Sequence, residues 1–351
     1  MFKSGFVEGI TEDPNRLNWA GNGPRPLSWA AWYPADKTVE TTEKLDGPQE
    51  YAYFNMGQIA ENASISDEKQ KWPLVLLSHG TGGSVQGMGW LARLLAEQGF
   101  IVLGVNHHGN TSKEPYLAEG FMTGWERTAD LSAILDQADD LPVICGRVDH
   151  DRVFACGFSF GGSTVIGLVG AITNQLQFVR WLESGGMPGD GPREFPNLGD
   201  EFPRLMGESK VFRNSMKRHS RSYLDKRVKA VVALAPGPPV RGYTAKSLKK
   251  ISVPIKIMTG EADEEAPFES CSVWLNQHNS TFELISLGKD VGHYTLVGVA
   301  TDLCRENDSR LSDDLPGVDR VEVLNRIAKE TAEFFDGFVE EKKSGWLNWL
   351  R

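Results

Sequence analysis

The chain has 351 residues, of which 40% are hydrophobic, and it carries a net charge of −10. This length suits one large domain with an insertion or two modest domains, and the apolar fraction is sufficient for a large core. No basic cluster is interleaved with aromatic residues, which argues against nucleic acid as a partner, and no apolar run reaches the roughly 18 residues that span a bilayer.

The first residues, MFKSGFVEGITEDPNR, lack the apolar segment of a signal peptide. We therefore expect a cytoplasmic protein, and a processed N-terminus leaves a periplasmic or secreted location as the alternative. The four cysteines (Cys145, Cys156, Cys271 and Cys304) form no CxxC pair, so no zinc site is indicated. A disulfide between Cys271 and Cys304 stays open, because spacing alone cannot test its geometry.

Apolar runs alternate with helical patterns along most of the chain. The stretch 26–34 alternates like a half-buried strand, whereas later runs such as PLVLLS (73–78) are continuously apolar. Such runs separated by helices predict an α/β fold with a mostly parallel sheet and helices on both faces. The expected strands are 26–34, 73–78, 100–105, 152–156, 229–234, 255–259 and 282–286, and the expected helices are 88–98, 125–141, 161–172 and 319–340.

Residues 174–226 break this alternation, with two Gly-Pro turns in GGMPGDGP, several aromatic and basic residues, and no strand pattern. A segment of this length without strand signals usually has a function of its own. We interpret 174–226 as a cap or lid inserted into a core formed by 1–173 and 227–351. The alternative is a peripheral helical decoration.

The stretch ACGFSFGG, residues 155–162, contains a Gly-x-Ser-x-Gly motif centred on Ser159. It follows the predicted strand 152–156 and leads into the predicted helix 161–172. Between a strand and a helix, the two glycines permit a sharp turn that projects the serine hydroxyl above the sheet. We therefore predict that Ser159 is a nucleophile, the alternative being a hydroxyl in a plain glycine turn.

A serine nucleophile needs a base, which after such a turn comes from a later loop of the chain. This order excludes four of the seven histidines, namely His79, His107, His108 and His150. Of the other three, His219 lies in the predicted cap and His278 in a predicted helix. His293 lies in a glycine-flanked loop just after the last predicted strand, and we predict that it is the base.

The acid that orients this base is predicted in the turn GEADEEAP after the strand 255–259. Asp263 is the best candidate, because open α/β sheets keep their sites at the carboxyl ends of the strands. Glu261, Glu264 and Glu265 are close enough in sequence to leave the assignment open. Asp290 is a distant rival, since it is too close to His293 in the chain to orient it easily.

Two backbone N–H groups must face the negative charge that develops on a substrate oxygen. We expect one from Phe160, the residue after the nucleophile, and one from the glycine loop 79–83. Thr81 is our choice in that loop, with Gly82 as the alternative. Gly82, His107, Trp125 and Trp181 are candidate substrate contacts, although we favour core packing for the tryptophans and a hydrogen-bonded loop position for His107.

With these residues placed, the chain resembles the α/β-hydrolase superfamily. More narrowly, it is similar to the platelet-activating-factor acetylhydrolase-like and predicted dienelactone hydrolase-like serine esterases. The stretches that carry the resemblance run in family order over almost the whole chain: RPLSWAAWYPA, LLSHGTGG, NHHGNT, WERTADLSAILD, GFSFGG, GEADEEAP, VGHYTL and PGVDRVEVLNRIAKETAEFF. The resemblance implies Ser159, Asp263 and His293 as nucleophile, acid and base, and Thr81 and Phe160 as oxyanion donors.

Two departures limit what the resemblance implies. Dienelactone hydrolases proper use a cysteine nucleophile, so their specificity for lactone rings does not extend to Ser159. In the acetylhydrolase proper the acid follows an earlier strand, and the corresponding stretch here, VVALAPGPPV, contains no carboxylate. That difference favours Asp263.

We predict a serine carboxylic-ester hydrolase that forms an acyl-enzyme on Ser159 and acts on a small-molecule ester without metal or organic cofactor. An amidase or acyltransferase with the same three residues is the alternative, and a non-catalytic binding protein on this fold is a third. The apolar stretch 344–351 could dock on its own chain or on a second copy, which leaves a homodimer open.

Overall fold

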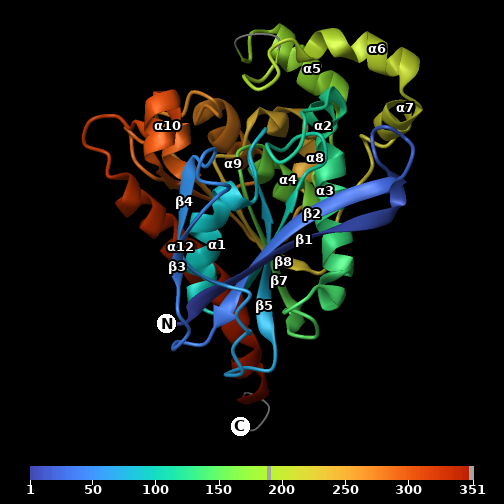
Figure 1. Ribbon diagram of the computed structural model, residues 1–351. Coiled ribbons are helices and arrows are strands. Elements are labelled where there is room, and N and C mark those ends of the chain that lie inside the picture. The colour runs from blue at the N-terminus through green and yellow to red at the C-terminus, as the bar shows by residue number, and fades with distance from the viewer. Residues whose placement is uncertain (188–190, 348–351) are drawn as a thin grey trace.

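The computed structural model describes residues 1–187 and 191–347, and in this part of the chain eleven strands form one sheet (Figure 1). The predicted turns in GGMPGDGP and the predicted docking stretch 344–351 extend into residues outside the described ranges. The strands are β1 (Lys3–Leu17), β2 (Pro24–Ala35), β3 (Thr42–Leu45), β4 (Phe54–Glu61), β5 (Trp72–Ser78), β6 (Ile101–Asn106), β7 (Val148–Phe158), β8 (Val228–Leu234), β9 (Ile255–Thr259), β10 (Glu283–Ser286) and β11 (Val299–Ala300).

The sheet is parallel in its central and C-terminal part. Its strand order is β10-β9-β8-β7-β5-β6-β2-β1-β4-β11, with β3 paired to β4, and β5 to β10 all pair in parallel. This confirms the α/β fold with a mostly parallel sheet. The N-terminal part differs, because β2, which contains the predicted strand 26–34, is antiparallel to both β6 and β1. Strands β1, β3, β4 and β11 extend the sheet beyond the predicted strands.

Helices cover both faces of this sheet. Figure 1 shows α1 and α12 on one side of the strands and α3 on the other, with α5, α6 and α7 gathered at one end of the sheet. The helices are α1 (Gly89–Glu97), α2 (Ala118–Met122), α3 (Gly124–Asp136), α4 (Phe160–Leu168), α5 (Gln175–Glu183), α6 (Glu201–Glu208), α7 (Lys210–Met216), α8 (Ala245–Leu248), α9 (Trp274–His278), α10 (Asp302–Asn307), α11 (Ser309–Ser312) and α12 (Arg320–Leu347).

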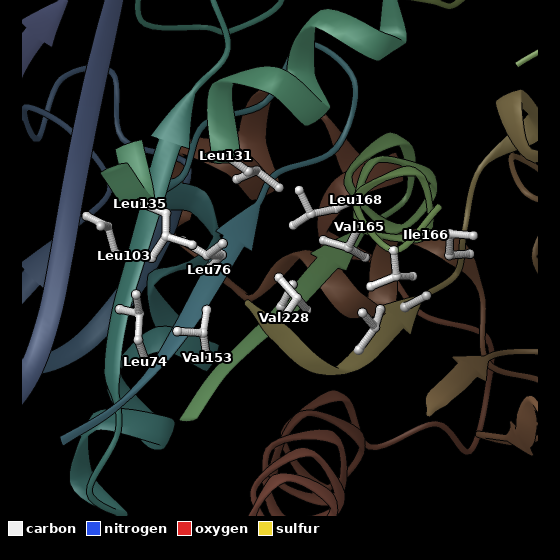
Figure 2. Close-up of a cluster of buried hydrophobic side chains, with 14 of the residues drawn as sticks. Leu74, Leu76, Leu103, Leu131, Leu135, Val153, Val165, Ile166, Leu168 and Val228 are labelled. Atoms are coloured by element: carbon white, nitrogen blue, oxygen red, sulfur yellow. The ribbon is translucent and has the colours of Figure 1, made fainter. Parts of the chain in front are cut away.

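The two faces of the sheet build two hydrophobic clusters. Along β5, Leu74 and Leu76 point to the cluster under α3 and α4, while Val75 and Leu77 point to the cluster under α1 and α12. Successive strand residues face opposite sides, so a strand covered on both faces must be apolar throughout. Figure 2 shows the first cluster, in which Leu131 and Leu135 of α3 and Val165 and Leu168 of α4 meet strand side chains.

Two predicted helices end earlier than expected. The helix predicted to residue 141 ends at Asp136, and a separate 3-10 turn covers Ala138–Asp140. The helix predicted to residue 172 ends at Leu168, since Gly170 has a φ of 112° that a right-handed helix cannot include.

The described part of the segment 174–226 contains the helices α5, α6 and α7, which are joined by turns. Among its contacts with the core, the Trp125 side chain of α3 donates from Nε1 to Ser215 Oγ at 2.9 Å. The four cysteines are free thiols, so the disulfide left open between Cys271 and Cys304 is not formed. Within the described residues, no helix combines the length and apolarity needed to traverse a lipid bilayer.

Candidate active site

Ser159 stands at the turn between β7 and α4 with a φ of 55° and a ψ of −118°. A residue other than glycine is strained at these backbone angles and keeps them only where the surrounding structure holds it. A Cβ on Gly157 would lie 2.2 Å from the Gly161 carbonyl oxygen, and a Cβ on Gly161 would lie 2.0 Å from the Ser78 carbonyl oxygen. Both positions flanking the serine therefore require glycine.

Ser159, His293 and Asp263 form one chain of hydrogen bonds. His293 Nε2 lies 3.0 Å from Ser159 Oγ, and His293 Nδ1 lies 2.7 Å from Asp263 Oδ2. Asp263 follows β9 and His293 follows β10, so adjacent parallel strands deliver both residues to the edge where β7 ends. This is the geometry in which a carboxylate orients a base toward a serine hydroxyl.

The carboxylate of Asp263 is fixed by its own loop. Its Oδ1 accepts the backbone N–H groups of Glu265, at 3.0 Å, and Ala266, at 2.6 Å, which leaves Oδ2 for His293. The rival carboxylates point elsewhere. Glu261 accepts from the Ser286 hydroxyl, Glu265 pairs with Arg193, Glu264 is exposed, and Asp290 lies 3.8 Å from Lys289.

The glycine loop 79–83 lies directly beside the serine. A Cβ on Gly80 would come within 3.3 Å of the Ser159 Cβ. The Gly82 N–H donates to Asn110 Oδ1 at 3.1 Å and is therefore engaged within the protein, which favours Thr81 of the two candidates in this loop. Phe160 is the first residue of α4, where N–H groups have no acceptor inside the helix.

His107 lies behind the loop and is fully buried. Its Nε2 is 2.9 Å from Ser78 Oγ and its Nδ1 is 3.0 Å from Asp130 Oδ2, so both ring nitrogens are used inside the core. Burial, reinforced by the positive charge of Arg127, lowers the pKa of His107 to about 3. The substrate contact expected at this position stays a prediction, although the ring itself is fully buried.

A cluster of buried charges surrounds His107. Burial alone would raise the pKa of Asp130, but Arg25 and Arg16 hold it well below its usual range. Arg25 Nε lies 2.7 Å from Asp130 Oδ1, and Arg16 Nη2 lies 2.6 Å from the same atom. Arg127 occupies the centre of this cluster, and burial lowers its pKa to about 9, which leaves it charged at neutral pH.

The two tryptophans have packing contacts outside the hydrogen-bonded chain of Ser159. Trp125 is buried, donates to Ser215 and lies 5.8 Å from the ring of His219. Trp181 of α5 lies 6.0 Å from the ring of Phe178, with the guanidinium of Arg241 over its face at 5.2 Å. Their role as substrate contacts stays a prediction.

Asn110 and Arg127 are residues of the site's surroundings that sequence reasoning missed. Arg127 lies in WERTADLSAILD, whose charged positions are typical of a solvated helix face, and Asn110 lies in NHHGNT. Both stretches carry the family resemblance, but nothing in their local pattern assigned a role to either residue.

Residues 49–124 match the model of a family described as platelet-activating factor acetylhydrolase, isoform II. Among solved structures, a ferulic acid esterase from Streptomyces cinnamoneus superposes with a TM-score of 0.61 at 17% identity, covering 95% of this chain and 89% of that one. A dipeptidyl-peptidase 5 from Porphyromonas gingivalis is 30% identical over 118 residues, which is 30% of this chain and 16% of that relative's length.

These similarities and the topology define an α/β-hydrolase fold, as the sequence predicted. The structural likeness, at 17% identity, establishes the fold alone. The family match supports a hydrolase.

Proposed function

We propose that the protein is a serine hydrolase of carboxylic esters that works through an acyl-enzyme on Ser159. The observation that carries this proposal is the hydrogen-bonded chain from Asp263 through His293 to Ser159, with the serine held at a φ of 55°. A strained serine at a strand-to-helix turn is typical of nucleophiles in this fold.

In the proposed reaction, Ser159 Oγ attacks the ester carbonyl carbon while His293 Nε2 takes the hydroxyl proton. Asp263 keeps the imidazole in the required tautomer and stabilises its charged form. The backbone N–H groups of Phe160 and Thr81 donate to the tetrahedral oxyanion. The C–O bond to the alcohol breaks as His293 protonates the leaving oxygen, and water repeats the sequence on the acyl-enzyme to release the acid and free Ser159.

We further propose that residues 174–226 act as a lid that shapes the entrance to this site. Arg193 pairs with Glu265 of the acid loop at 2.6 Å, and a Cβ on Gly82 would lie 2.6 Å from Glu194 Cγ. Two consecutive residues of the insertion thus lie against the two loops that flank the serine. Burial raises the pKa of Glu194, which is consistent with its carboxyl lying against the core and not in open solvent.

Hydrolysis of p-nitrophenyl acetate and a long-chain p-nitrophenyl ester, together with fluorophosphonate labelling, tests the proposal. Ser159→Ala should lower kcat by roughly 10⁶ and abolish labelling, and Asp263→Asn should lower kcat by roughly 10⁴. Glu264→Gln, at the exposed residue next to Asp263, is the matched control and should keep wild-type turnover. Wild-type protein that neither turns over these esters nor labels at Ser159 would refute the proposal.

An amidase is the second candidate, favoured by the match to a dipeptidyl-peptidase over 118 residues. Esters and amides share the acyl-enzyme and differ in the leaving group. Comparison of a p-nitrophenyl ester with the p-nitroanilide of the same acyl group, and with dipeptide p-nitroanilides, separates the two activities. A kcat/KM for anilides that exceeds the value for esters would make the protein an amidase.

A further inference from the structure

Arg127 of α3 is buried directly beneath the glycine loop, with 1% of its surface exposed. Its Nη2 donates to the carbonyl oxygen of His79 and lies 3.4 Å from Ser78 Oγ. Its Nη1 donates to Asn110 Oδ1 at 2.7 Å, and its Nε donates to Thr164 Oγ1 at 3.2 Å. A single guanidinium therefore connects four segments that meet behind Ser159.

The turn that contains Thr81 is held by a hydrogen bond at each end. The His79 carbonyl, at the start of the turn, accepts from Arg127 directly. The Gly82 N–H, at its end, donates to the same Asn110 oxygen that Arg127 binds. The turn around Thr81 is therefore held at its start by Arg127 and at its end by Asn110, which Arg127 binds in turn.

The same guanidinium also contacts the second oxyanion arm. Its central carbon lies 4.5 Å from the ring centre of Phe160, a cation–π contact. Thr164, which accepts from Arg127, donates its hydroxyl to the carbonyl oxygen of Phe160 at 2.9 Å. Arg127 is thus in contact with both segments whose N–H groups would bind the oxyanion.

The donors of Arg127 go to neutral acceptors. Asp130, the carboxylate that faces it, is already bound by Arg16, Arg25 and His107. A charge buried in this way is costly unless its hydrogen bonds are satisfied. The planar fork of arginine can satisfy several acceptors at fixed angles, which a lysine cannot reproduce.

We propose, on the basis of the proposed esterase function, that Arg127 is a positioning residue that fixes the spacing of the Thr81 and Phe160 N–H groups for the oxyanion. It does not touch substrate. Its loss separates the two arms of the oxyanion site while Ser159, His293 and Asp263 keep their own hydrogen bonds.

The test compares Arg127→Lys with Arg25→Lys, a matched control. Arg25 is equally buried and binds Asp130, but its hydrogen bonds are to that carboxylate and not to the oxyanion segments. We expect Arg127→Lys to lower kcat for p-nitrophenyl acetate about 100-fold with KM within about threefold, as for a small misplacement of catalytic groups. Affinity for phenylboronic acid, which forms a tetrahedral adduct on the serine, should fall in parallel. Arg25→Lys should lower Tm and leave kcat per folded molecule unchanged.

A second pair of variants keeps the test decisive if Arg127→Lys does not fold. Thr164→Val removes the hydroxyl that links Arg127 to Phe160 at nearly constant volume, and Thr164→Ser retains it. We expect about a tenfold loss of kcat in the valine variant and near wild-type kcat in the serine variant, with KM unchanged in both. The loss should be smaller than the roughly 100-fold effect of Arg127→Lys, because Thr164→Val removes only the link to Phe160.

Wild-type activity in Arg127→Lys, or equal losses in Arg127→Lys and Arg25→Lys that follow their folded fractions, would overturn the positioning role alone. Equal kcat values in Thr164→Val and Thr164→Ser would do the same. If the wild type itself shows no turnover and no fluorophosphonate labelling, the proposed function fails, and the role of Arg127 fails with it.

Discussion

At the scale of residues, burial separates Ser159, the proposed nucleophile, from a second serine with partners of the same kind. Two hydrogen-bonded Ser–His–Asp sets lie within the described residues, Ser159–His293–Asp263 and Ser78–His107–Asp130. Their hydrogen-bond distances agree to within 0.3 Å, but Ser78 is fully buried whereas Ser159 is partly exposed. A low pKa also keeps His107 neutral, so it cannot accept a proton as a base does at neutral pH.

The glycine after the nucleophile offers a sharp test of the turn. In Gly161→Ala the new methyl carbon would lie 2.0 Å from the Ser78 carbonyl oxygen, so the backbone must move. We expect the free energy of unfolding to fall by about 1–3 kcal/mol, as in other overpacked sites. Esterase activity per folded molecule should also fall, because the turn that holds Ser159 must move. Urea denaturation measures the first and p-nitrophenyl acetate turnover the second.

Gly207 of α6 is the control for this substitution, because a Cβ there meets no atom within 4 Å. Gly207→Ala should leave stability unchanged or raise it by up to about 1 kcal/mol through helix propensity. A Gly161→Ala protein as stable and active as Gly207→Ala would contradict the steric argument.

The residues proposed for catalysis were predictable because each lies at a local pattern. Ser159 has its glycines, and Asp263 and His293 each follow an apolar strand. Arg127 was not predictable, because its partners come from three other segments and a charged helix residue normally faces solvent. The charge of Arg127 can be buried because these segments together supply the acceptors for its hydrogen bonds.

At the scale of elements, β1, β3 and β4 were the N-terminal strands that sequence patterns did not predict. β1 is interrupted by Gly5, Gly9 and Pro14 and is rich in charge, so it lacks a clear apolar alternation. Its pairing with β2 over 11 consecutive positions, from Lys3 to Asp13, is set by the partner strand rather than by its own pattern. Strand propensity is decided by such neighbours, which a single sequence does not display.

One of the contacts that hold the insertion to the core is made by Ser215, a buried serine of α7. Ser215 Oγ accepts from Trp125 and donates to Glu126 Oε1 at 2.5 Å. Ser215→Ala leaves the tryptophan N–H without this acceptor, which costs about 1–3 kcal/mol. We expect faster tryptic cleavage within residues 204–221, because α7 then separates more easily from α3.

Ser184→Ala is the control, since this serine is exposed and bonds only within its own segment, to the Trp181 carbonyl. Its cleavage rate should equal that of the wild type. Equal rates for Ser215→Ala and Ser184→Ala would show that the insertion is held in another way.

At the scale of the whole molecule, buried histidines make stability depend on pH. Burial lowers the pKa of both His79 and His107, with Arg127 adding to the effect on each and Arg25 on His107, although Asp130 acts in the opposite direction. Below pH of about 6.5 the unfolded chain binds protons that the folded protein does not, so stability falls as pH falls. The slope reaches about 1.4 kcal/mol per pH unit for each histidine.

Urea denaturation between pH 7 and pH 5.5 measures this slope before most carboxylates titrate. Asp46 and Glu194 have raised pKa values and oppose the trend, mainly at lower pH. His107→Gln should remove about one histidine's share of the slope. A wild-type stability that does not change over this range would contradict the assignment of neutral buried imidazoles.

The short ladder between β4 and β11 constrains the order in which the chain can fold. Val299 and Ala300 of β11 pair with residues 55 and 54 of β4. Beside them, the Thr301 hydroxyl donates to the carbonyl oxygen of Ala52, which lies 249 positions earlier in the chain. At ribosomal rates of about 5–20 residues per second, that stretch takes roughly 12–50 s to synthesise. Throughout this time the edge of β4 remains unpaired on this side, and an open strand edge can recruit other chains. The nascent protein is therefore most prone to aggregate before residue 301 has emerged.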